Sequence, residues 1–461
     1  MNSFIVRLIL VYIRHFARMG LLKHKPSVIG ITGSVGKSST RNIVYAALRD
    51  HVNVKVLDKG NSEIGIPLAL LGLTSKSLGF QTIMTSIVDW ARILISAPFS
   101  VDYLKGTQYV IAEMGVDEPD PPKNMGYLLT ILKPQIAVFL NVFPAHTLQF
   151  DPVIDHRITD PQQRLAALQR AIAYEKGKII TESDCTTGIY NTDNQFVVDA
   201  VESFYHTHPQ TKQLTFGTST ESSISYGEYV ITTEGTKFEF MIRGAQVTVS
   251  LAGYVLPIEY RELIAASLLV AHSAGISYND AARSIEKHFS LPSGRSSLFK
   301  GIHNSLIIDS SYNASRISNL AFISLAHKLA AQEKRKLVFL MGDMRELGQE
   351  AATEHEQVAK ELMKHVDTLY LVGPQVKKYV VPYIEKHGEL SHVKTIKWFE
   401  NSMQAGAYMK EHIEPHSLIL VKGSQNTIYL EEAIKQILES KDDQKKLCRQ
   451  EPHWLAAKGI A

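Results

Sequence analysis

A glycine-rich segment between an apolar strand and a helix constrains this chain more than any other feature. The segment Gly30-Ile-Thr-Gly33-Ser-Val-Gly36-Lys37-Ser38-Ser39-Thr40 follows the apolar run Val28 to Ile31 and opens a helix predicted over Lys37 to Leu48. Glycines in such a loop let backbone N–H groups point at phosphate oxygens, and the start of the helix adds a favourable electrostatic field. The segment therefore predicts a phosphate-binding loop, with a purely structural glycine turn as the alternative.

Both backbone and side chains of this loop are expected to contact a nucleotide. The ammonium of Lys37 is expected to neutralise the β- and γ-phosphates, and the hydroxyl of Ser38 to ligate Mg²⁺. The pattern departs from the strict phosphate-loop motif, because Ile31 occupies the position of the first glycine. The residues expected to bind ATP here are Gly33, Ser34, Val35, Gly36, Lys37, Ser38 and Ser39.

The rest of the chain predicts an α/β fold. After Pro26, short β-type runs such as 109–114 and 136–142 alternate with helix-like stretches, which is typical of a doubly wound parallel sheet. Residues 224–251 alternate polar and apolar side chains around two turns, Glu234-Gly235 and Arg243-Gly244, and so predict an appended antiparallel segment. A helix is predicted over 258–274.

A second α/β series, Rossmann-like, begins after the Pro- and Gly-containing stretch 291–295. Its strands are predicted at 306–309, 336–341, 368–372 and 417–421, and its helices include 318–331 and 349–364. Four parts result: a basic amphipathic helix at 1–26, a phosphate-loop-containing central domain at 27–295, a C-terminal α/β domain at 296–440, and a loosely held polar tail at 441–461.

Composition narrows the classes of function. The net charge of +3 over 461 residues is too small for bulk attraction to nucleic acid, so no nucleic-acid partner is expected. The only cysteines, Cys185 and Cys448, are far apart in sequence, which excludes a disulfide framework and fits the reducing cytoplasm. A monomer is expected.

Two interpretations of residues 1–26 remain open. Arg7, Arg14 and Arg18 interrupt the apolar run, so it is too short to span a membrane. The segment is either a helix packed on the next domain or a basic amphipathic helix lying on the inner face of the membrane.

Several further motifs follow the phosphate loop in the order seen in a known family. The loop itself has the form TGxxGK[ST][ST], and with these motifs the chain resembles the Mur ligases, ATP-dependent enzymes that build the peptide of bacterial cell-wall precursors. The resemblance covers roughly residues 28–435, and Tyr312-Asn313 and 343–348 favour the branch that adds D-alanyl-D-alanine. The matching segments are Gly60 to Pro67, Glu113-Met-Gly115, Asn141 to His146, Lys176-Gly177, Gly294-Arg295, Ile308 to Ala314, Gly342 to Gly348 with His355, and Val421 to Ser424.

The resemblance implies a reaction in which ATP phosphorylates a carboxylate and an amine then attacks the acyl phosphate. It implies that Lys37 and two Mg²⁺ ions offset the charge repulsion, with Ser38 holding one ion and Glu113 and His146 the other. It further implies that Lys176 is carbamylated and supports the second ion. Each of these residues has a structural alternative. Lys176 could be an exposed lysine, Glu113 a solvated carboxylate, and His146 a hydrogen-bonded loop histidine.

In the C-terminal domain the resemblance implies two groups of site residues. Arg295 and Asp309 would contact ATP, while four others would orient the amine substrate, unless they are turn or cap residues: Tyr312, Asn313, Asp343 and Lys422.

The expected activity is an ATP-dependent amide ligase of peptidoglycan precursor synthesis, acting on a small peptide or nucleotide-sugar-peptide substrate. Only about 26 residues precede the first predicted strand, so the UDP-binding domain usual in this family is expected to be absent. Two alternatives therefore stay open: a Mur-like ligase for another carboxylate, such as a poly-amino acid or other wall peptide, and a non-catalytic nucleotide-binding scaffold.

Overall fold

The structure, a computed structural model, describes residues 3–459 apart from 59, 61, 75–82, 145–146, 346, 389–390 and 425–426. The chain forms two compact units. The first comprises Met1–Glu228, Glu239–Val249 and Arg261–Phe289, and the second Tyr229–Phe238, Ser250–Tyr260 and Ser290–Ala461. The second unit thus resumes at Ser290, next to the predicted boundary, but it also takes two segments that the sequence assigns to the central domain.

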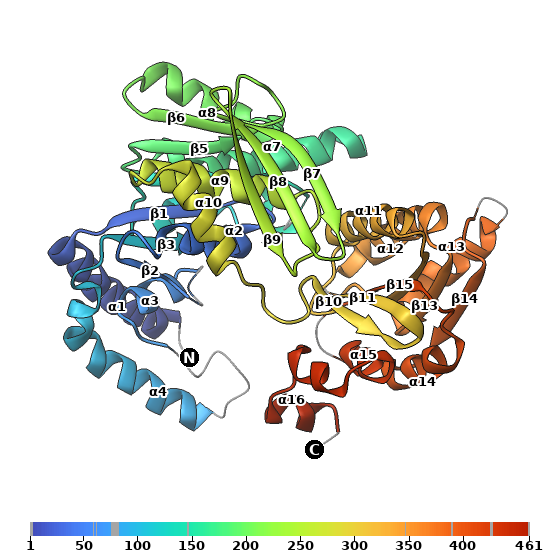
Figure 1. The fold of residues 1–461 in the computed structure, drawn as a ribbon. Helices are drawn as coiled ribbons and strands as arrows, with labels where there is room; N and C mark the ends of the chain where they lie inside the picture. The colour runs from blue at the N-terminus through green and yellow to red at the C-terminus, as the bar shows by residue number, and fades with distance from the viewer. Residues whose placement is uncertain are drawn as a thin grey trace. The chain divides into compact units, whose positions relative to one another are not determined.

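A nine-stranded sheet carries the phosphate loop, in the order β2-β3-β1-β4-β5-β6-β7-β8-β9 (Figure 1). Strands β2 to β6 are parallel to their neighbours, and β7, β8 and β9 follow one another through two-residue turns, which join antiparallel strands. The predicted parallel sheet with an appended antiparallel segment is confirmed. The strands are β1 (Ser27–Thr32), β2 (Val54–Val56), β3 (Tyr109–Glu113), β4 (Ile136–Phe139), β5 (Thr187–Asn191), β6 (Lys212–Gly217), β7 (Ile224–Thr232), β8 (Gly235–Ile242) and β9 (Ala245–Ala252).

The first unit also contains helices. The helix that follows the phosphate loop, α2, spans Lys37–Leu48 as predicted. Ile13 and Ala17 of the first helix belong to the same buried core as Val110 and Phe139 of the sheet, so this helix packs on the domain. No helix among the described residues is long and apolar enough to cross a membrane. The helices are α1 (Ser3–His24), α2 (Lys37–Leu48), α3 (Gly65–Leu70), α4 (Ile83–Ser96), η2 (Ala97–Leu104), α5 (Met125–Leu129), α6 (Thr147–Phe150), η3 (Asp151–Val153), α7 (Pro161–Thr181), α8 (Gln195–Thr207), α9 (Tyr260–Ser273) and α10 (Tyr278–His288).

The second unit contains a six-stranded sheet in the order β10-β11-β15-β12-β13-β14, in which only β10 is antiparallel to its neighbour. All four predicted strands are present, whereas β10 and β14 are not among the predictions. The strands are β10 (Ser297–Gly301), β11 (Ser305–Ser310), β12 (Lys336–Gly342), β13 (Thr368–Val372), β14 (Thr395–Phe399) and β15 (Ser417–Lys422). The helices include α11 (Arg316–Gln332), α12 (Ala351–His365), α13 (Val381–Lys386), α14 (Ser402–His412), α15 (Glu431–Ile437) and α16 (Pro452–Ala457).

The segment after residue 440 differs from the predicted loose tail. Leu447, Cys448 and Arg449 are buried. The Arg449 guanidinium donates hydrogen bonds of 2.9 and 2.8 Å to the carboxylate of Glu431, and the Lys458 ammonium lies 2.7 Å from the same carboxylate. Composition alone misleads here, because the polar residues of the segment neutralise a buried acid on α15.

Candidate active site

The phosphate loop joins β1 to α2 and has the backbone that nucleotide binding needs. Gly36 precedes α2 with φ of 88°, a left-handed conformation that favours glycine. A Cβ at Gly36 would also come within 2.7 Å of the Leu263 side chain. The loop therefore depends on glycine at this position both for its conformation and for space.

Asn141, just beyond β4, holds the other end of the loop. Its side-chain oxygen accepts a hydrogen bond of 2.9 Å from the Val35 N–H, and its amide nitrogen donates one of 3.2 Å to the Val35 carbonyl. The Asn141 carbonyl also accepts from the Ser34 N–H at 3.0 Å. Asn141 begins one of the motifs found in the sequence but has no predicted role; only the pairing of β1 with β4 places it against the loop.

Lys37 and Ser38 begin α2, and both face the loop. The Lys37 ammonium donates to the Gly33 carbonyl at 2.8 Å, and burial lowers its pKa while the charges of Glu113 and Asp117 act in the opposite direction. A lysine held this way already lies along the loop that would surround phosphate groups.

The Ser38 hydroxyl donates a hydrogen bond of 2.7 Å to the carboxylate of Glu113, at the end of β3. Glu113 is buried, and Arg41 lies 3.8 Å from the same carboxylate oxygen. This pair offers two hard oxygen donors, the type that Mg²⁺ prefers, and leaves its other positions to phosphate and water oxygens. Among the described residues no three His, Cys, Asp or Glu side chains are grouped so that they could hold a metal. His146 lies outside the described residues.

Lys176 lies on α7 and is almost fully buried, so the exposed-lysine alternative is wrong. Its ammonium donates to the Val116 carbonyl at 3.2 Å, in the loop that follows Glu113. Burial lowers its pKa to about 7, and the positive charge of Lys37 acts in the same direction. The carboxylate of its neighbour Glu175 has other partners: it accepts a hydrogen bond of 2.8 Å from the Met125 N–H and forms an ion pair of 2.6 Å with Lys178.

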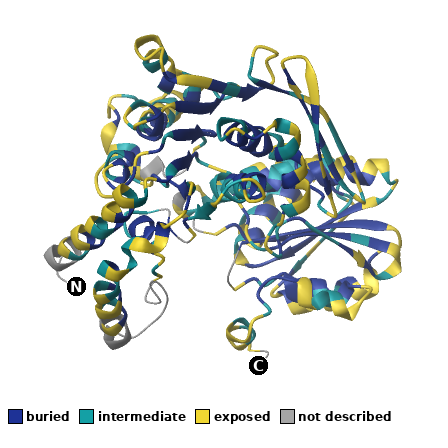
Figure 2. Cartoon of the chain, turned by 60° about the vertical axis from the view of Figure 1, so that its left-hand side comes forward, coloured by how far each residue is buried: buried dark blue, intermediate teal, exposed yellow. Residues whose placement is uncertain are grey.

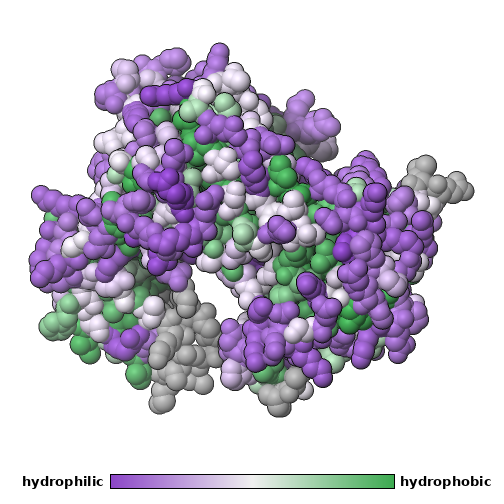
Figure 3. Space-filling view, viewed as in Figure 1, coloured by the Kyte–Doolittle hydropathy of each residue, from purple (hydrophilic) through white to green (hydrophobic). Residues whose placement is uncertain are grey.

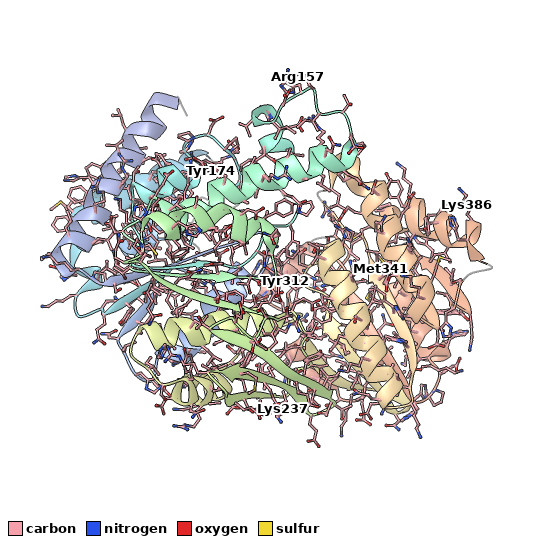
Figure 4. The ribbon with its side chains drawn as sticks, turned by 90° about the horizontal axis from the view of Figure 1, so that it is seen from above. Arg157, Tyr174, Lys237, Tyr312, Met341 and Lys386 are labelled. Carbon is pink, nitrogen blue, oxygen red and sulfur yellow. The ribbon has the colours of Figure 1, made fainter. Side chains whose placement is uncertain are left out.

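The second unit gathers candidate residues beyond the carboxyl ends of adjacent parallel strands, where α/β proteins place ligands. Lys422 ends β15 and donates to the Asn313 carbonyl at 2.9 Å and to the Ser310 hydroxyl at 3.1 Å. Burial lowers the pKa of Lys422 to about 7. Tyr312 follows β11, and Met341 of β12 pairs in register with Lys422. Figure 4 labels Tyr312 and Met341.

Arg295 and Asp309 both present polar atoms that lack hydrogen-bond partners. The Arg295 guanidinium lies over the Tyr312 ring at 4.8 Å, and its Nε is buried without a partner among the described residues. Asp309 is fully buried; its Oδ1 accepts from the Ser311 N–H at 3.0 Å, while its Oδ2 has no partner there. Burial raises the pKa of Asp309 to about 6. Buried polar atoms without partners are uncommon, and a catalytic or binding role is one explanation for them; others in the described part of the chain, such as Thr107 Oγ1 and Tyr205 Oη, lie outside the candidate site.

Asp343 lies beyond β12 in a different setting. Its Oδ1 accepts hydrogen bonds of 2.9 Å from the N–H groups of Gln375 and Val376, and its carbonyl accepts from the Ser424 N–H. Burial raises the pKa of Asp343. One oxygen of this side chain therefore anchors the turn after β13, and the other remains as a candidate contact for the amine.

Comparisons with known proteins agree with both units. Residues 31–153 match the Mur ligase middle domain, and residues 294–425 match the Mur ligase, glutamate ligase domain. UDP-N-acetylmuramoyl-tripeptide–D-alanyl-D-alanine ligase of Synechocystis sp. is 24% identical over 439 residues, which cover 95% of this chain and 80% of the relative. The Bacillus subtilis protein of the same name is 26% identical over 437 residues, covering 94% and 80%.

A solved structure also has this fold. The crystal structure of MurF ligase from Thermotoga maritima in complex with ADP superimposes with a TM-score of 0.67 at 21% identity, over 94% of this chain and 84% of that one. The two domain matches together span more than half of the chain, in the order that the sequence motifs predict. The chain therefore belongs to the Mur ligase family, whose members are ATP-dependent ligases.

Proposed function

We propose that this chain uses ATP to join a muramyl-peptide carboxylate to D-alanyl-D-alanine or a similar dipeptide. The observation that carries the proposal is the Ser38–Glu113 hydrogen bond of 2.7 Å, which ties the start of the phosphate-loop helix to the carboxyl end of β3. The names of the relatives from Synechocystis sp. and Bacillus subtilis support this choice of substrates.

The proposed reaction has two steps, phosphorylation of the carboxylate and formation of the amide bond. A carboxylate oxygen of the acceptor attacks the γ-phosphorus of ATP, which forms an acyl phosphate and releases ADP. The dipeptide amine then attacks the acyl carbon, loses a proton, and displaces inorganic phosphate. Lys37 offsets the negative charge that gathers on the transferred phosphoryl group, and the backbone N–H groups at the start of α2 orient its oxygens.

We propose that two Mg²⁺ ions act here, one held through Ser38 and the other through Glu113 and His146. The ions would supply charge neutralisation between the anionic carboxylate and the γ-phosphate. The Ser38 and Glu113 oxygens fit this role because they are hard donors that lie 2.7 Å apart, and each would hold one of the ions.

Lys176 is proposed to act as a carbamate. Carbon dioxide adds only to an unprotonated amine, and the N–C bond forms with loss of one proton. An ordinary lysine is almost wholly protonated at neutral pH, whereas the pKa of Lys176 is lowered to about 7. Burial thus favours the reactive, unprotonated amine, and the carbamate formed from it would support the second ion.

The amine-binding role is proposed for Tyr312, Asn313, Lys422 and Asp343, and ATP contacts for Arg295 and Asp309. Lys422 fixes the Asn313 backbone, so it orients the Tyr312-Asn313 loop as well as adding charge there. We place the protein in the cytoplasm, in keeping with two free, buried cysteines, and propose that it works as a monomer.

The test measures ADP released by purified protein with ATP, UDP-muramyl-tripeptide and D-alanyl-D-alanine. We expect release to require both peptide substrates and to fall by at least a hundredfold in Lys37→Ala, because the phosphoryl group loses its cationic partner. Lys360→Ala, at an exposed lysine of α12, is the matched control and should retain full activity. Release that depends on ATP but on neither peptide would contradict the proposal.

A further inference from the structure

Exposed apolar side chains gather on one part of the first unit. Nine of the sixteen exposed large apolar residues in the described part of the chain lie in α1 and in the continuous segment α4–η2. Figure 3 shows hydrophobic atoms at the lower left, where Figure 1 places these helices. Soluble monomers seldom expose clustered apolar surface without a partner, so this gathering calls for an explanation.

Helix α1 is apolar on two faces. Its inner face packs Ile13 and Ala17 into the core of the first unit. Its outer face carries a second stripe at helical spacing, which ends at Leu22 with 70% of its surface exposed. The members of this outer stripe are Leu8, Val11, Tyr12, Met19 and Leu22.

The segment α4–η2 repeats the arrangement. Ile93 and Leu104 point inward and are buried, while an outer stripe recurs at the spacing of successive helical turns. Within it Ile95 is 68% exposed and Phe99 is 85% exposed. The members of this stripe are Val88, Ile95 and Phe99, whereas the Tyr103 ring packs beside Lys55, whose Nζ lies 3.6 Å from the ring centroid.

The two segments lie side by side, so their stripes form one surface (Figures 1 and 2). The Tyr12 hydroxyl, on the outer face of α1, donates to the Leu94 carbonyl of α4 at 3.2 Å. Further along, Lys23 lies 2.6 Å from Asp102 of η2. Gly20 permits the close approach, because a Cβ there would lie 3.0 Å from the Val101 carbonyl oxygen. We call the eight outer residues of these two stripes the apolar surface.

Positive charge borders the apolar surface. Residues 1–26 contain five lysines and arginines and no acid, and one of the five, Lys23, is paired with Asp102 of η2. A groove of about 620 Å³ opens at the end of α1, and Leu22 of the apolar surface lines it together with the basic side chains of Arg18, Lys25 and Lys133. Asp184, which pairs with Lys133, is the single acidic residue among the groove's lining residues. The combination of apolar stripes and a basic border fits a surface that is apolar within and anionic at its boundary.

We propose that the apolar surface docks this protein onto a lipid bilayer that contains anionic lipids. The outer faces of α1 and α4–η2 enter the headgroup boundary, and Arg18 and Lys25 meet the anionic headgroups. A second copy of the chain would bring the same basic border against itself, so charge complementarity favours the anionic membrane. The surface is distinct from the phosphate loop and does not depend on the proposed ligase activity.

The test sediments the full-length protein with vesicles of phosphatidylcholine mixed with phosphatidylglycerol, and with vesicles of phosphatidylcholine alone. We expect partitioning at least tenfold stronger onto the anionic vesicles and a decrease with added salt. The double variant Ile95→Glu/Phe99→Glu should lose at least tenfold in partitioning, because two acids would have to enter the apolar boundary. The variant Arg18→Glu/Lys25→Glu should lose binding to the anionic vesicles only.

The matched control is Met403→Glu/Lys410→Glu, at an exposed apolar and an exposed basic residue of α14, which should bind vesicles as the parent does. Melting temperature and ADP release in solution should be unchanged in all variants, which separates loss of docking from loss of folding or catalysis. Equal partitioning of parent and Ile95→Glu/Phe99→Glu would overturn the proposal. So would a dimer in light scattering that the same variant dissociates, since a second copy would then cover the surface.

Discussion

Asp309 combines two properties that separate a site residue from a structural one. Its carboxyl is fully buried, and one of its oxygens lacks a partner among the described residues. A residue kept only for stability would satisfy both oxygens, because a buried polar atom without a partner costs free energy. Asp309 therefore costs the folded state stability, and the proposed contact with ATP explains why the carboxyl is present.

Asp309→Asn should stabilise the protein while it reduces activity. Burial raises the pKa of Asp309 to about 6, above its ordinary value of 3.8, so the charged form is disfavoured in the folded state. The cost is present above the folded pKa and disappears as the pH falls towards the unfolded value. We expect the Asp309→Asn variant to gain roughly 2 kcal/mol in the free energy of unfolding above that pKa, and little well below it.

Urea denaturation, once above the folded pKa of Asp309 and once well below it, measures this gain in the free energy of unfolding. ADP release measures the loss of activity. Asp120→Asn, at an exposed acid, is the control and should change neither quantity. An Asp309→Asn variant with lowered stability above the pKa would show that the carboxylate stabilises the fold.

Burial also shifts the pKa of Lys176, but it lowers this pKa because the charged form of lysine is the protonated one. Its amine loses its proton as the pH rises through about 7, so carbamate formation should increase over that interval. With ¹³C-labelled bicarbonate, the parent should give a carbamate resonance in ¹³C spectra that is absent in Lys176→Ala. That variant should lose activity and regain part of it when short-chain carboxylic acids are added.

Lys178→Ala provides a control at a neighbouring position, since Lys178 pairs with Glu175 and is less deeply buried than Lys176. A carbamate resonance of unchanged intensity in Lys176→Ala would refute the role of this residue.

At the scale of single elements, the sequence predicts most accurately where the signal is local. The bounds of α2 follow from the glycines before it and its apolar periodicity, and both are read from adjacent residues. The role of Asn141 cannot be read this way, because it depends on β4 lying next to β1 in the sheet. Strand β14 is not predicted although its more and less exposed side chains alternate, because alternation over five residues is a weak signal by itself.

An experiment can show whether tertiary contacts hold the segment after residue 440. Arg449→Met should destabilise the protein by about 1 to 3 kcal/mol, because the buried Glu431 would lose its bidentate partner and keep only Lys458. The double variant Glu431→Leu/Arg449→Met should recover part of this loss, since it leaves no buried acid at this position. Urea denaturation provides the measurement.

Lys445→Met, at an exposed lysine of the same segment, should leave stability unchanged. Equal unfolding curves for Arg449→Met and the parent would mean that the segment is loosely held, as composition alone predicts.

At the scale of the whole molecule, the order of the two α/β series is predicted, but the division of the chain between the two units is not. The residues 229–238 and 250–260 belong to the second unit although β7, β8 and β9 continue the first sheet. Tertiary contacts decide this: the Tyr229 hydroxyl donates to the Leu256 carbonyl at 2.8 Å, and Ile231 joins the second unit's core. Such contacts leave no periodicity in the sequence.

The proposed activity of the whole molecule is to activate a carboxylate with ATP and then form an amide bond. Its most direct test uses UDP-muramyl-tripeptide in which both oxygens of the acceptor carboxylate are ¹⁸O, together with ATP and D-alanyl-D-alanine, and measures the mass of the released phosphate. An acyl phosphate transfers one carboxylate oxygen to phosphorus, so we expect one ¹⁸O in each phosphate and a product that carries the dipeptide. Unlabelled phosphate, or phosphate released without a dipeptide-containing product, would contradict this mechanism.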